Sequence, residues 1–368
     1  MKSRAPYRMT LRPQLGIATD ALAELSLSAS DVLDLCTGKN PAAPPRAVLE
    51  AARDADLLGY PDPTGTTARA RVAQRFGIGS DAVVLGSGGA ELLWSCARVL
   101  LEPNTTVLAI EPSYPEFATA ARQLGARVVQ WRSVERTGHC VDLAQVAELM
   151  ALETPQVVSI CAPGNPTGAS VRFAELAALA AHFPDAQFVV DQSFLALSDD
   201  REDMLRLPAR NMLCVRSLSK EFGIPGVRAA YALAEPGLCA RIEATRPAYS
   251  TSSQTQAVIA AAMDQATFSE ACAMQVHADR QRLAALLEQL GLTFTPSVAP
   301  FLLVRLARAS EIARELLARH RIAVCDATPF GLPDHLRISG VSGDDAPQLT
   351  AALAELTRQR GLVHGRES

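Results

Sequence analysis

Short apolar runs alternate with longer amphipathic segments over much of this chain, and this rhythm restricts the fold more than any other feature. The runs show little polar alternation, as expected of strands that are covered on both faces. Strands are expected at residues 83–85, 106–110, 127–131, 156–160, 187–191, 212–216 and 227–233. Helices are expected between them at residues 90–101, 115–124, 143–152 and 173–182. The pattern predicts a mostly parallel sheet, so residues 41–244 should form one large α/β domain.

The pattern changes after residue 244. A long helical tract is expected over residues 254–290, followed by short strands at 301–306, 322–324 and 336–338. A length of 368 residues favours two domains, and the change of pattern predicts a smaller α+β domain at 245–368. The first forty residues are irregular and rich in turns, which indicates an N-terminal arm over residues 1–40.

Composition argues against several classes of function. The formal net charge is −4 and no long basic run is present, which does not fit nucleic-acid binding. No apolar run has the length of a membrane span, and the N-terminal residues lack the apolar stretch of a secretory signal. The eight cysteines include no Cys-x-x-Cys pair, and several lie in apolar runs. They are expected to be free thiols in a reducing compartment, the cytoplasm, and not metal ligands.

Lys220 has the most specific chemical surroundings in the sequence. It ends the run Ser217-Leu218-Ser219-Lys220 after an apolar stretch, and Arg228 follows eight residues later. A lysine amine forms a Schiff base with a carbonyl compound when burial or a neighbouring cation lowers its pKa. Hydroxyl groups and a guanidinium are the donors that a phosphate needs nearby. Together these residues predict a lysine condensed with pyridoxal 5'-phosphate (PLP), although a lysine among serines is by itself more often in a solvated loop.

Two glycine-containing turns also follow expected strands. The run Gly86-Ser87-Gly88-Gly89-Ala90 opens a helix, whose free N–H groups can bind a phosphate; an ordinary tight turn is the alternative. The dinucleotide-binding fingerprint is incomplete here, because Glu91 stands where its last glycine should be. The run Asn165-Pro166-Thr167-Gly168 is turn chemistry at the C-terminal end of a strand, where open α/β sheets bind ligands.

Single charged and aromatic residues extend the set. Asp191 ends a buried strand and needs a partner such as a protonated pyridine nitrogen; the alternative is a helix cap. Arg337 lies between apolar residues, so it is expected to face an anion or to form an internal ion pair. Tyr114 follows a strand and can stack on a planar heterocycle, and Tyr60 lies beside proline turns. Ordinary packing is the alternative for either tyrosine.

The order of these motifs resembles that of the fold-type I PLP-dependent enzymes, the aspartate aminotransferase superfamily, from about residue 40 to residue 339. Within that superfamily, Tyr60-Pro61-Asp62-Pro63, residues 222–228 and Leu336-Arg337-Ile338-Ser339 are similar to histidinol-phosphate aminotransferases and threonine-phosphate decarboxylases. The resemblance implies a mostly parallel seven-stranded sheet in the large domain and a smaller α+β C-terminal domain. It also implies PLP as cofactor and a homodimer with shared active sites.

The resemblance implies how the cofactor would be held. Lys220 would form the Schiff base and move the proton at the substrate Cα, and Asp191 would pair with the pyridine nitrogen. Asn165 would bind the 3'-oxygen of the ring, and Tyr114 would stack on the ring. Phe194 stands where the family often has a tyrosine, and it cannot donate a hydrogen bond to the 3'-oxygen. The phosphate would be held by Tyr60 of a neighbouring subunit, the backbone amides of Gly89 and Ala90, Ser217, Ser219 and Arg228.

The resemblance also implies the substrate contacts. Arg337 would bind the substrate carboxylate through two parallel hydrogen bonds, with Asn165 and Asn40 nearby. Cys325 stands where relatives often carry an arginine, which weakens the case for a phosphorylated substrate. Lys39 replaces an acidic residue of the family and changes the charge at the mouth of the substrate site.

Four functions fit these residues to different degrees. Transamination of a small-molecule amino acid or related amine is the first interpretation, and Cα decarboxylation is the second. These two reactions share every cofactor contact and differ in which Cα bond stands perpendicular to the ring. A catalytically silent binding protein is third, because Lys220, Asp191 and Arg228 are all present. A dinucleotide-dependent oxidoreductase is fourth, because the glycine fingerprint is incomplete.

Overall fold

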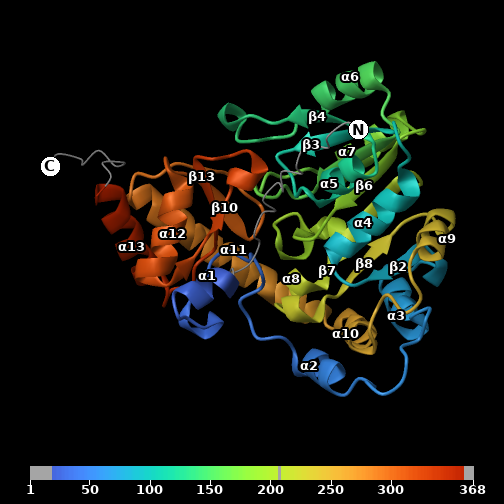
Figure 1. The fold of residues 1–368 in the computed structure, drawn as a ribbon, viewed down its shortest axis with the longest axis horizontal. Helices are drawn as coiled ribbons and strands as arrows, with labels where there is room; N and C mark the ends of the chain where they lie inside the picture. Colours follow the sequence, from blue (N-terminus) through green and yellow to red (C-terminus); the bar gives the residue numbers. More distant parts are fainter. Residues whose placement is uncertain (1–18, 206–208, 360–368) are drawn as a thin grey trace, which may run out of the picture.

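A seven-stranded sheet forms the centre of the larger part of the molecule (Figure 1). The computed structural model describes residues 19–205 and 209–359. The strands of this sheet are β2 (Val83–Gly86), β3 (Thr106–Glu111), β4 (Arg127–Arg132), β5 (Val157–Cys161), β6 (Gln187–Asp191), β7 (Met212–Ser217) and β8 (Ala230–Leu233). Their order is β2-β8-β7-β6-β5-β3-β4. All neighbours are parallel except β8, which runs antiparallel to β2 and β7.

All seven strands form where the sequence predicts them, and the sheet is mostly parallel as predicted. Only β8 begins clearly later than expected. Pro225–Val227 form a 3-10 helix, and Arg228 has a positive φ of 60°, which interrupts the extended backbone. Every residue of β2, β3 and β8 is buried, whereas β4 is an edge strand with partly exposed side chains.

Helices cover both faces of the sheet, which explains why its inner strands are mostly apolar. The helices of this part are α2 (Arg46–Arg53), α3 (Thr66–Phe76), α4 (Gly89–Leu100), α5 (Glu116–Gln123), α6 (Leu143–Glu153), α7 (Phe173–His182), α8 (Leu218–Glu221), α9 (Pro236–Thr245) and α10 (Ser253–Met263). Successive residues of β5 face opposite layers. Val157 belongs to the apolar cluster with α4, α5 and α9, and Val158 belongs to the cluster with α6 and α7.

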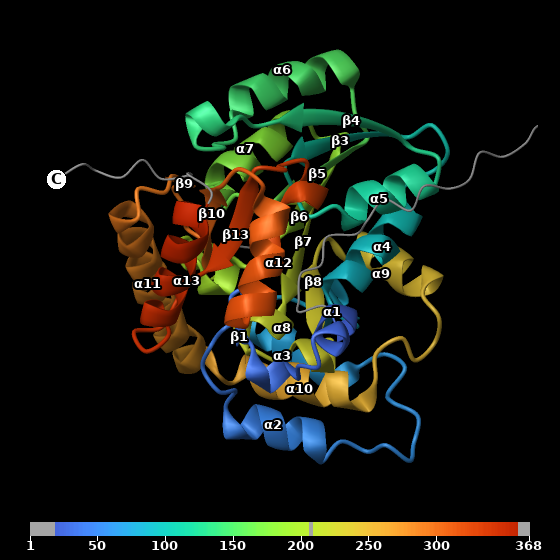
Figure 2. The same cartoon turned by 60° about the vertical axis from the view of Figure 1, so that its left-hand side comes forward.

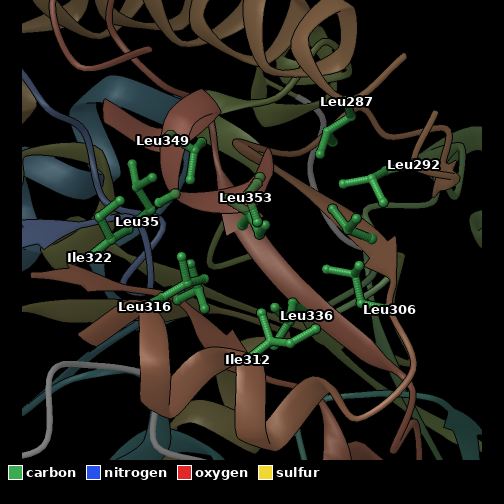
Figure 3. Close-up of a cluster of buried hydrophobic side chains, with 14 of the residues drawn as sticks. Leu35, Leu287, Leu292, Leu306, Ile312, Leu316, Ile322, Leu336, Leu349 and Leu353 are labelled. Carbon is green, nitrogen blue, oxygen red and sulfur yellow. The ribbon is translucent and has the colours of Figure 1, made fainter. Parts of the chain in front are cut away.

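A smaller body lies beside the large sheet (Figures 1 and 2). Its helices are α1 (Thr19–Glu24), α11 (Ala266–Gln289), α12 (Ala309–His320) and α13 (Ala346–Gln359). Its strands are β1 (Leu33–Asp34), β9 (Phe294–Thr295), β10 (Phe301–Arg305), β11 (Ile322–Ala323), β12 (Cys325–Asp326) and β13 (His335–Ser339). The order β12-β13-β10-β9 is antiparallel, and β1 pairs with β11 in parallel. Leucine and isoleucine side chains from α11, α12, α13 and these strands form one core (Figure 3).

Two predictions about this region need correction. The tract expected over residues 254–290 is two helices, separated at Asp264 and Gln265. Helix α10 buries Val258 and Ile259 against α2, α3 and the large sheet, whereas α11 buries Leu283 in the small core. The first forty residues are not wholly irregular either, because β1 joins the small body and Leu35 lies in its core.

The division of the chain into residues 1–40, 41–244 and 245–368 stays a prediction, and residues 1–18 of the expected arm lie outside the described residues. Within the described parts of the chain, no helix combines the length and apolar character needed to cross a membrane.

Candidate active site

A cavity of about 470 Å³ lies at the carboxyl edge of the large sheet. Parallel strands end at the same edge, so residues from distant parts of the chain meet there. Nine of the residues predicted from the sequence line this cavity: Gly89, Ala90, Tyr114, Asn165, Asp191, Ser217, Ser219, Lys220 and Arg228. Residues that sequence reasoning did not single out for this site also line it: Ala29, Asp34, Thr37, Ser193 and Pro225.

Lys220 lies in α8, directly after β7, with its amine at the cavity. Its Nζ donates a hydrogen bond to the backbone oxygen of Thr37 at 3.0 Å. Burial, followed by the nearby charge of Arg337, lowers the pKa of the Lys220 amine to about 8. Roughly one tenth of the amine is then neutral at pH 7, whereas an ordinary lysine has almost none. A neutral amine is the nucleophilic form, so this lysine is prepared to react with a carbonyl group.

The segment Thr37–Asn40 lies across Lys220 and contacts both its side-chain amine and its backbone oxygen. Lys220 Nζ donates to Thr37 O, and the backbone N–H of Asn40 donates to Lys220 O at 2.9 Å. Gly38 between them has φ +66°, and a Cβ there would lie 3.1 Å from the ring of Phe194. Glycine therefore allows the segment to pass this close to the ring. Gly38 signals a turn in the sequence, but nothing in the sequence pairs this turn with Lys220.

Asp191 is the last residue of β6 and is buried beside the cavity. Its Oδ1 accepts the backbone N–H of Ser193 at 2.9 Å. Burial raises the pKa of the Asp191 carboxyl, while the hydrogen bonds from Ser193 and the charge of Lys220 act in the opposite direction. The next helical turn begins after Phe194, so Asp191 is not its cap. A buried carboxylate that faces a cavity is suited to pair with a cationic ring nitrogen.

The N-terminus of α4 and the side chain of Arg228 face each other closely. Gly88, with φ +94°, precedes the helix, and a Cβ at this position would lie 2.2 Å from Arg228 Nη2. Arg228 also donates from Nη1 to the backbone oxygen of Pro225 at 3.1 Å. Free N–H groups of the first helical turn, a guanidinium and the hydroxyls of Ser217 and Ser219 therefore border one end of the cavity. This donor set fits a phosphate group.

Arg337 lies in β13 and is completely buried next to the cavity. Its Nη1 donates to Asn165 Oδ1 at 2.6 Å, and its Nη2 donates to the backbone oxygen of Cys36 at 2.5 Å. Its guanidinium lies 4.7 Å from the ring centre of Phe301 and 5.9 Å from that of Phe194. Among the described residues, no carboxylate forms an ion pair with Arg337. The internal ion pair considered from the sequence is therefore not found there, and Asn165 separates the guanidinium from the cavity.

Three other residues singled out in the sequence do not line the cavity. Asn40 does not line the cavity: its amide donates to Glu221 O at 2.8 Å and accepts from Ala42 N at 2.9 Å. Both polar groups of its side chain therefore have partners in the chain, and a contact of Asn40 with substrate stays a prediction. Tyr60 is 86% exposed and stacks on Tyr249, with 4.7 Å between ring centres. Cys325 is buried beside Arg337, its neighbour across the strand pair, and does not line the cavity.

The residues of the cavity fit PLP. A buried lysine with a lowered pKa, a buried carboxylate and a phosphate-binding end lie together at one sheet edge. Glycine at position 88 keeps the space beside Arg228 open, because a Cβ there would lie 2.2 Å from Arg228 Nη2. A cofactor with an aldehyde, a pyridine nitrogen and a phosphate matches these three features.

Comparisons with known proteins agree with the geometry. The family model described as aminotransferase class I and II matches residues 30–356. A histidinol-phosphate aminotransferase of Symbiobacterium thermophilum is 32% identical over 325 residues, which is 87% of this chain and 88% of the relative. The corresponding enzyme of Bacillus subtilis is 29% identical and covers 88% of this chain and 91% of its own.

Solved structures share the fold. Histidinol-phosphate aminotransferase from Sinorhizobium meliloti, in complex with pyridoxal-5'-phosphate, superposes with a TM-score of 0.83 at 22% identity, over 98% of this chain and all of that one. The L-threonine-O-3-phosphate decarboxylase of Porphyromonas gingivalis has a TM-score of 0.75 at 22% identity, over 89% of this chain and all of its own. This chain therefore belongs to the class I and II aminotransferases and is a PLP-dependent enzyme of fold type I.

Proposed function

We propose that this aminotransferase carries out its reaction in the cavity around Lys220, on an amino acid or related amine that enters next to Arg337. The observation that carries the proposal is the buried amine of Lys220, with a pKa of about 8, in one cavity with Asp191 and Arg228. PLP, when bound, supplies the electron sink for the substrate Cα. The protein has to hold it, orient the substrate and move one proton.

The residues divide these tasks. Lys220 would hold the cofactor and, once released, take and return the proton at the substrate Cα, because a lysine of lowered pKa can act as a base near neutral pH. Asp191 would keep the pyridine nitrogen protonated. Arg228, the N-terminus of α4 and the serines of β7 and α8 would bind the phosphate.

Arg337 is proposed to bind the substrate carboxylate. A fully buried guanidinium without a carboxylate partner among the described residues is costly unless an anion joins it. Asn165 Oδ1 now accepts one of its donors at 2.6 Å, and Asn165 also lines the cavity. An arriving carboxylate would replace this acceptor, which leaves Asn165 free to turn toward the cofactor.

We also propose that two copies of the chain share their active sites in the cytoplasm. Tyr60, Leu57 and Leu58 are 86%, 69% and 101% exposed, which is unusual for a cluster of large apolar side chains and typical of an interface. A tyrosine on such a segment can reach a phosphate in a second copy. All eight cysteines carry thiols and not disulfides, which fits a reducing compartment.

An amino-donor screen with two readouts tests the proposed reaction. Purified protein with bound PLP is given a panel of amino acids and a 2-oxo acid acceptor, and the released oxo acid and carbon dioxide are both measured. Oxo acid without carbon dioxide is the expected result. Carbon dioxide as the main product would replace transamination by decarboxylation, and the absence of any product with every donor would contradict both.

A further inference from the structure

Cys36 and Cys325 are neighbours in the fold, although they lie near opposite ends of the chain. Strand β1 pairs with β11 in parallel, with Asp34 opposite Ala323. The backbone N–H of Leu35 donates to Ala323 O at 2.9 Å, so the pairing continues beyond β1. The same register places Cys36 opposite Cys325, and both side chains belong to one apolar cluster. The thiol of Cys36 donates a hydrogen bond to the sulfur of Cys325.

The spacing of this pair suits a disulfide bond. Facing residues of neighbouring strands lie about 4.8 Å apart. A disulfide joins cysteines whose Cα atoms are about 4.4–6.8 Å apart. Both cysteines carry thiols in this structure. Oxidation of the pair therefore requires the two sulfurs to approach to about 2.05 Å, with only a small movement of the backbone.

The two thiols differ in acidity, as the members of a reactive pair do. The hydrogen bond from Cys36 and the charge of Arg337 lower the pKa of the Cys325 thiol to about 7, against the effect of burial. The same hydrogen bond raises the pKa of the Cys36 thiol. Near neutral pH, Cys325 is therefore partly a thiolate, which is the nucleophilic form, while Cys36 keeps its proton.

The pair adjoins two groups of the active site. Cys325 lies opposite Arg337 in the strand pair β12–β13, and the backbone oxygen of Cys36 accepts from Arg337 Nη2 at 2.5 Å. The next residue, Thr37, accepts from Lys220 Nζ at 3.0 Å. A movement of Cys36 toward β12 would therefore shift the acceptors of both cations.

We propose that Cys36 and Cys325 form a thiol-modification site, which a hydroperoxide oxidises to a disulfide that lowers the activity of the adjacent cavity. The Cys325 thiolate attacks one oxygen of the peroxide, the O–O bond breaks, and a sulfenic acid and hydroxide form. The sulfur of Cys36 then attacks that of Cys325, and the S–O bond breaks with loss of a second hydroxide. The proton of Cys36 and the proton that Cys325 had released convert both hydroxides to water. Two electrons pass from the sulfurs to the peroxide.

A peroxide molecule reaches the pair through local opening of the chain, because both thiols are buried. Strands β1 and β11 have two residues each, and such short pairings open more readily than the centre of a large sheet. Cys140 is exposed and should react without any opening. The parent protein for the test is therefore Cys140→Ser, and oxidation of Cys140 in the wild type shows that the peroxide is active.

Mass spectrometry of the PLP-bound parent protein, treated with hydrogen peroxide, tests the modification itself. The chain should lose two hydrogen atoms, and digestion should give one linked pair of peptides, containing Cys36 and Cys325. Cys96 and Cys239 are the control within the same chain, because they share one apolar cluster and burial raises the pKa of both thiols. They should stay reduced. Absence of the linked peptides, or equal linkage of Cys96 and Cys239, would overturn the proposal.

Activity tests the consequence of the bond, and this part rests on the proposed function. The linked protein should show a kcat/KM for an amino acid donor that is lower by about tenfold to a hundredfold, as expected when groups of an active site shift by about 1 Å. Dithiothreitol should restore it, and Cys325→Ser should keep its activity in peroxide. An unchanged kcat/KM in fully linked protein would overturn the effect on the cavity.

Failure of the proposed function would look different. If no donor reacts with the reduced protein, transamination in this cavity is contradicted, and the linked peptides still decide whether the pair is a modification site. The effect on the cavity is then measured without a donor, as the rate at which PLP-free protein combines with PLP through Lys220. This rate should be lower in the linked protein, and equal rates would overturn the effect. The thermal midpoint checks that Cys325→Ser is folded, and Cys36→Ser is the second variant that cannot form the bond.

Discussion

The lining of the cavity and the segment that carries Tyr60 are built in opposite ways. Asp191 is buried and Lys220 is partly buried at strand ends, and each forms hydrogen bonds within its own chain. Tyr60, Leu57 and Leu58 lie on the surface between α2 and α3, and Tyr60 contacts only Tyr249 among the aromatic rings described. One chain therefore completes the buried side of the site, whereas the exposed segment gains a role only if a second copy approaches. Variants in each region can break or sharpen this contrast.

Lys220→Ala should have the largest effect, with loss of turnover. The amine is the proposed proton carrier, and it is desolvated at the cavity, whereas the side chain of Lys39, the other lysine there, is 37% exposed. The fold should remain, because the side chain makes one hydrogen bond, to Thr37 O, and its burial opposes the charged form. Turnover and thermal midpoint are measured on the same sample. Full activity of the pure variant would remove Lys220 from the mechanism.

Asp191→Asn should lower kcat by about 10²–10⁴, as is typical for the loss of a catalytic acid–base or electrostatic contribution. An amide cannot hold the pyridine nitrogen in its protonated form. PLP content is kept at saturation and checked by absorbance, so that cofactor loss does not imitate the effect. A decrease of less than about threefold would mean that the carboxylate only stabilises the turn in which it accepts the backbone N–H of Ser193.

Arg337→Lys should lower kcat/KM by about tenfold to a hundredfold for donors with an α-carboxylate, although the charge is kept. Lysine cannot make two parallel hydrogen bonds, and it would also lose the contacts with Asn165 and Cys36 O. A primary amine without a carboxylate is the matched donor and should be affected much less. Equal losses for both donors would assign Arg337 a structural role.

Tyr60→Phe should weaken PLP binding by about tenfold, the worth of one hydrogen bond to a charged group. The tyrosine is proposed to act in the site of the other copy. Adding Lys220→Ala protein, whose Tyr60 is intact, should therefore raise the PLP affinity and activity of Tyr60→Phe at low PLP concentration. Wild-type behaviour of Tyr60→Phe, or no gain on mixing, would contradict a shared site.

The smallest effect concerns pH. The neutral amine is the reactive form, so the rate at which PLP-free protein combines with added PLP should rise with pH and level off above about pH 8. Between pH 7 and the plateau the rise should be about tenfold, because a pKa one unit above the pH leaves one tenth neutral. Stopped-flow absorbance measures this rate. A midpoint near the ordinary lysine value of 10.5 would show that burial does not act on Lys220.

The sequence by itself was enough to predict the strands of the sheet and most of the residues that line the cavity. Seven apolar runs, most of them without polar alternation, predict strands covered on both faces, and strands form at all seven. Parallel strands end at a common edge, so motifs that follow strands were expected to meet. Asn165, Asp191 and Lys220, which each lie at or just after a strand end, are together in one cavity for this reason. The order of the motifs also pointed to the correct family.

The tertiary structure decided what lies across that edge. Thr37 and Lys220 are 183 residues apart, and Arg337 and Cys36 are 301 apart, so no local pattern connects them. The side chain of Asn40 donates to Glu221 O, 181 residues away, which no local pattern around Asn40 indicates. The pattern of apolar residues along a strand indicates only which faces of that strand are buried. The partner of a buried polar group depends on how distant segments pack, and that is fixed only when the two bodies of the molecule fold together.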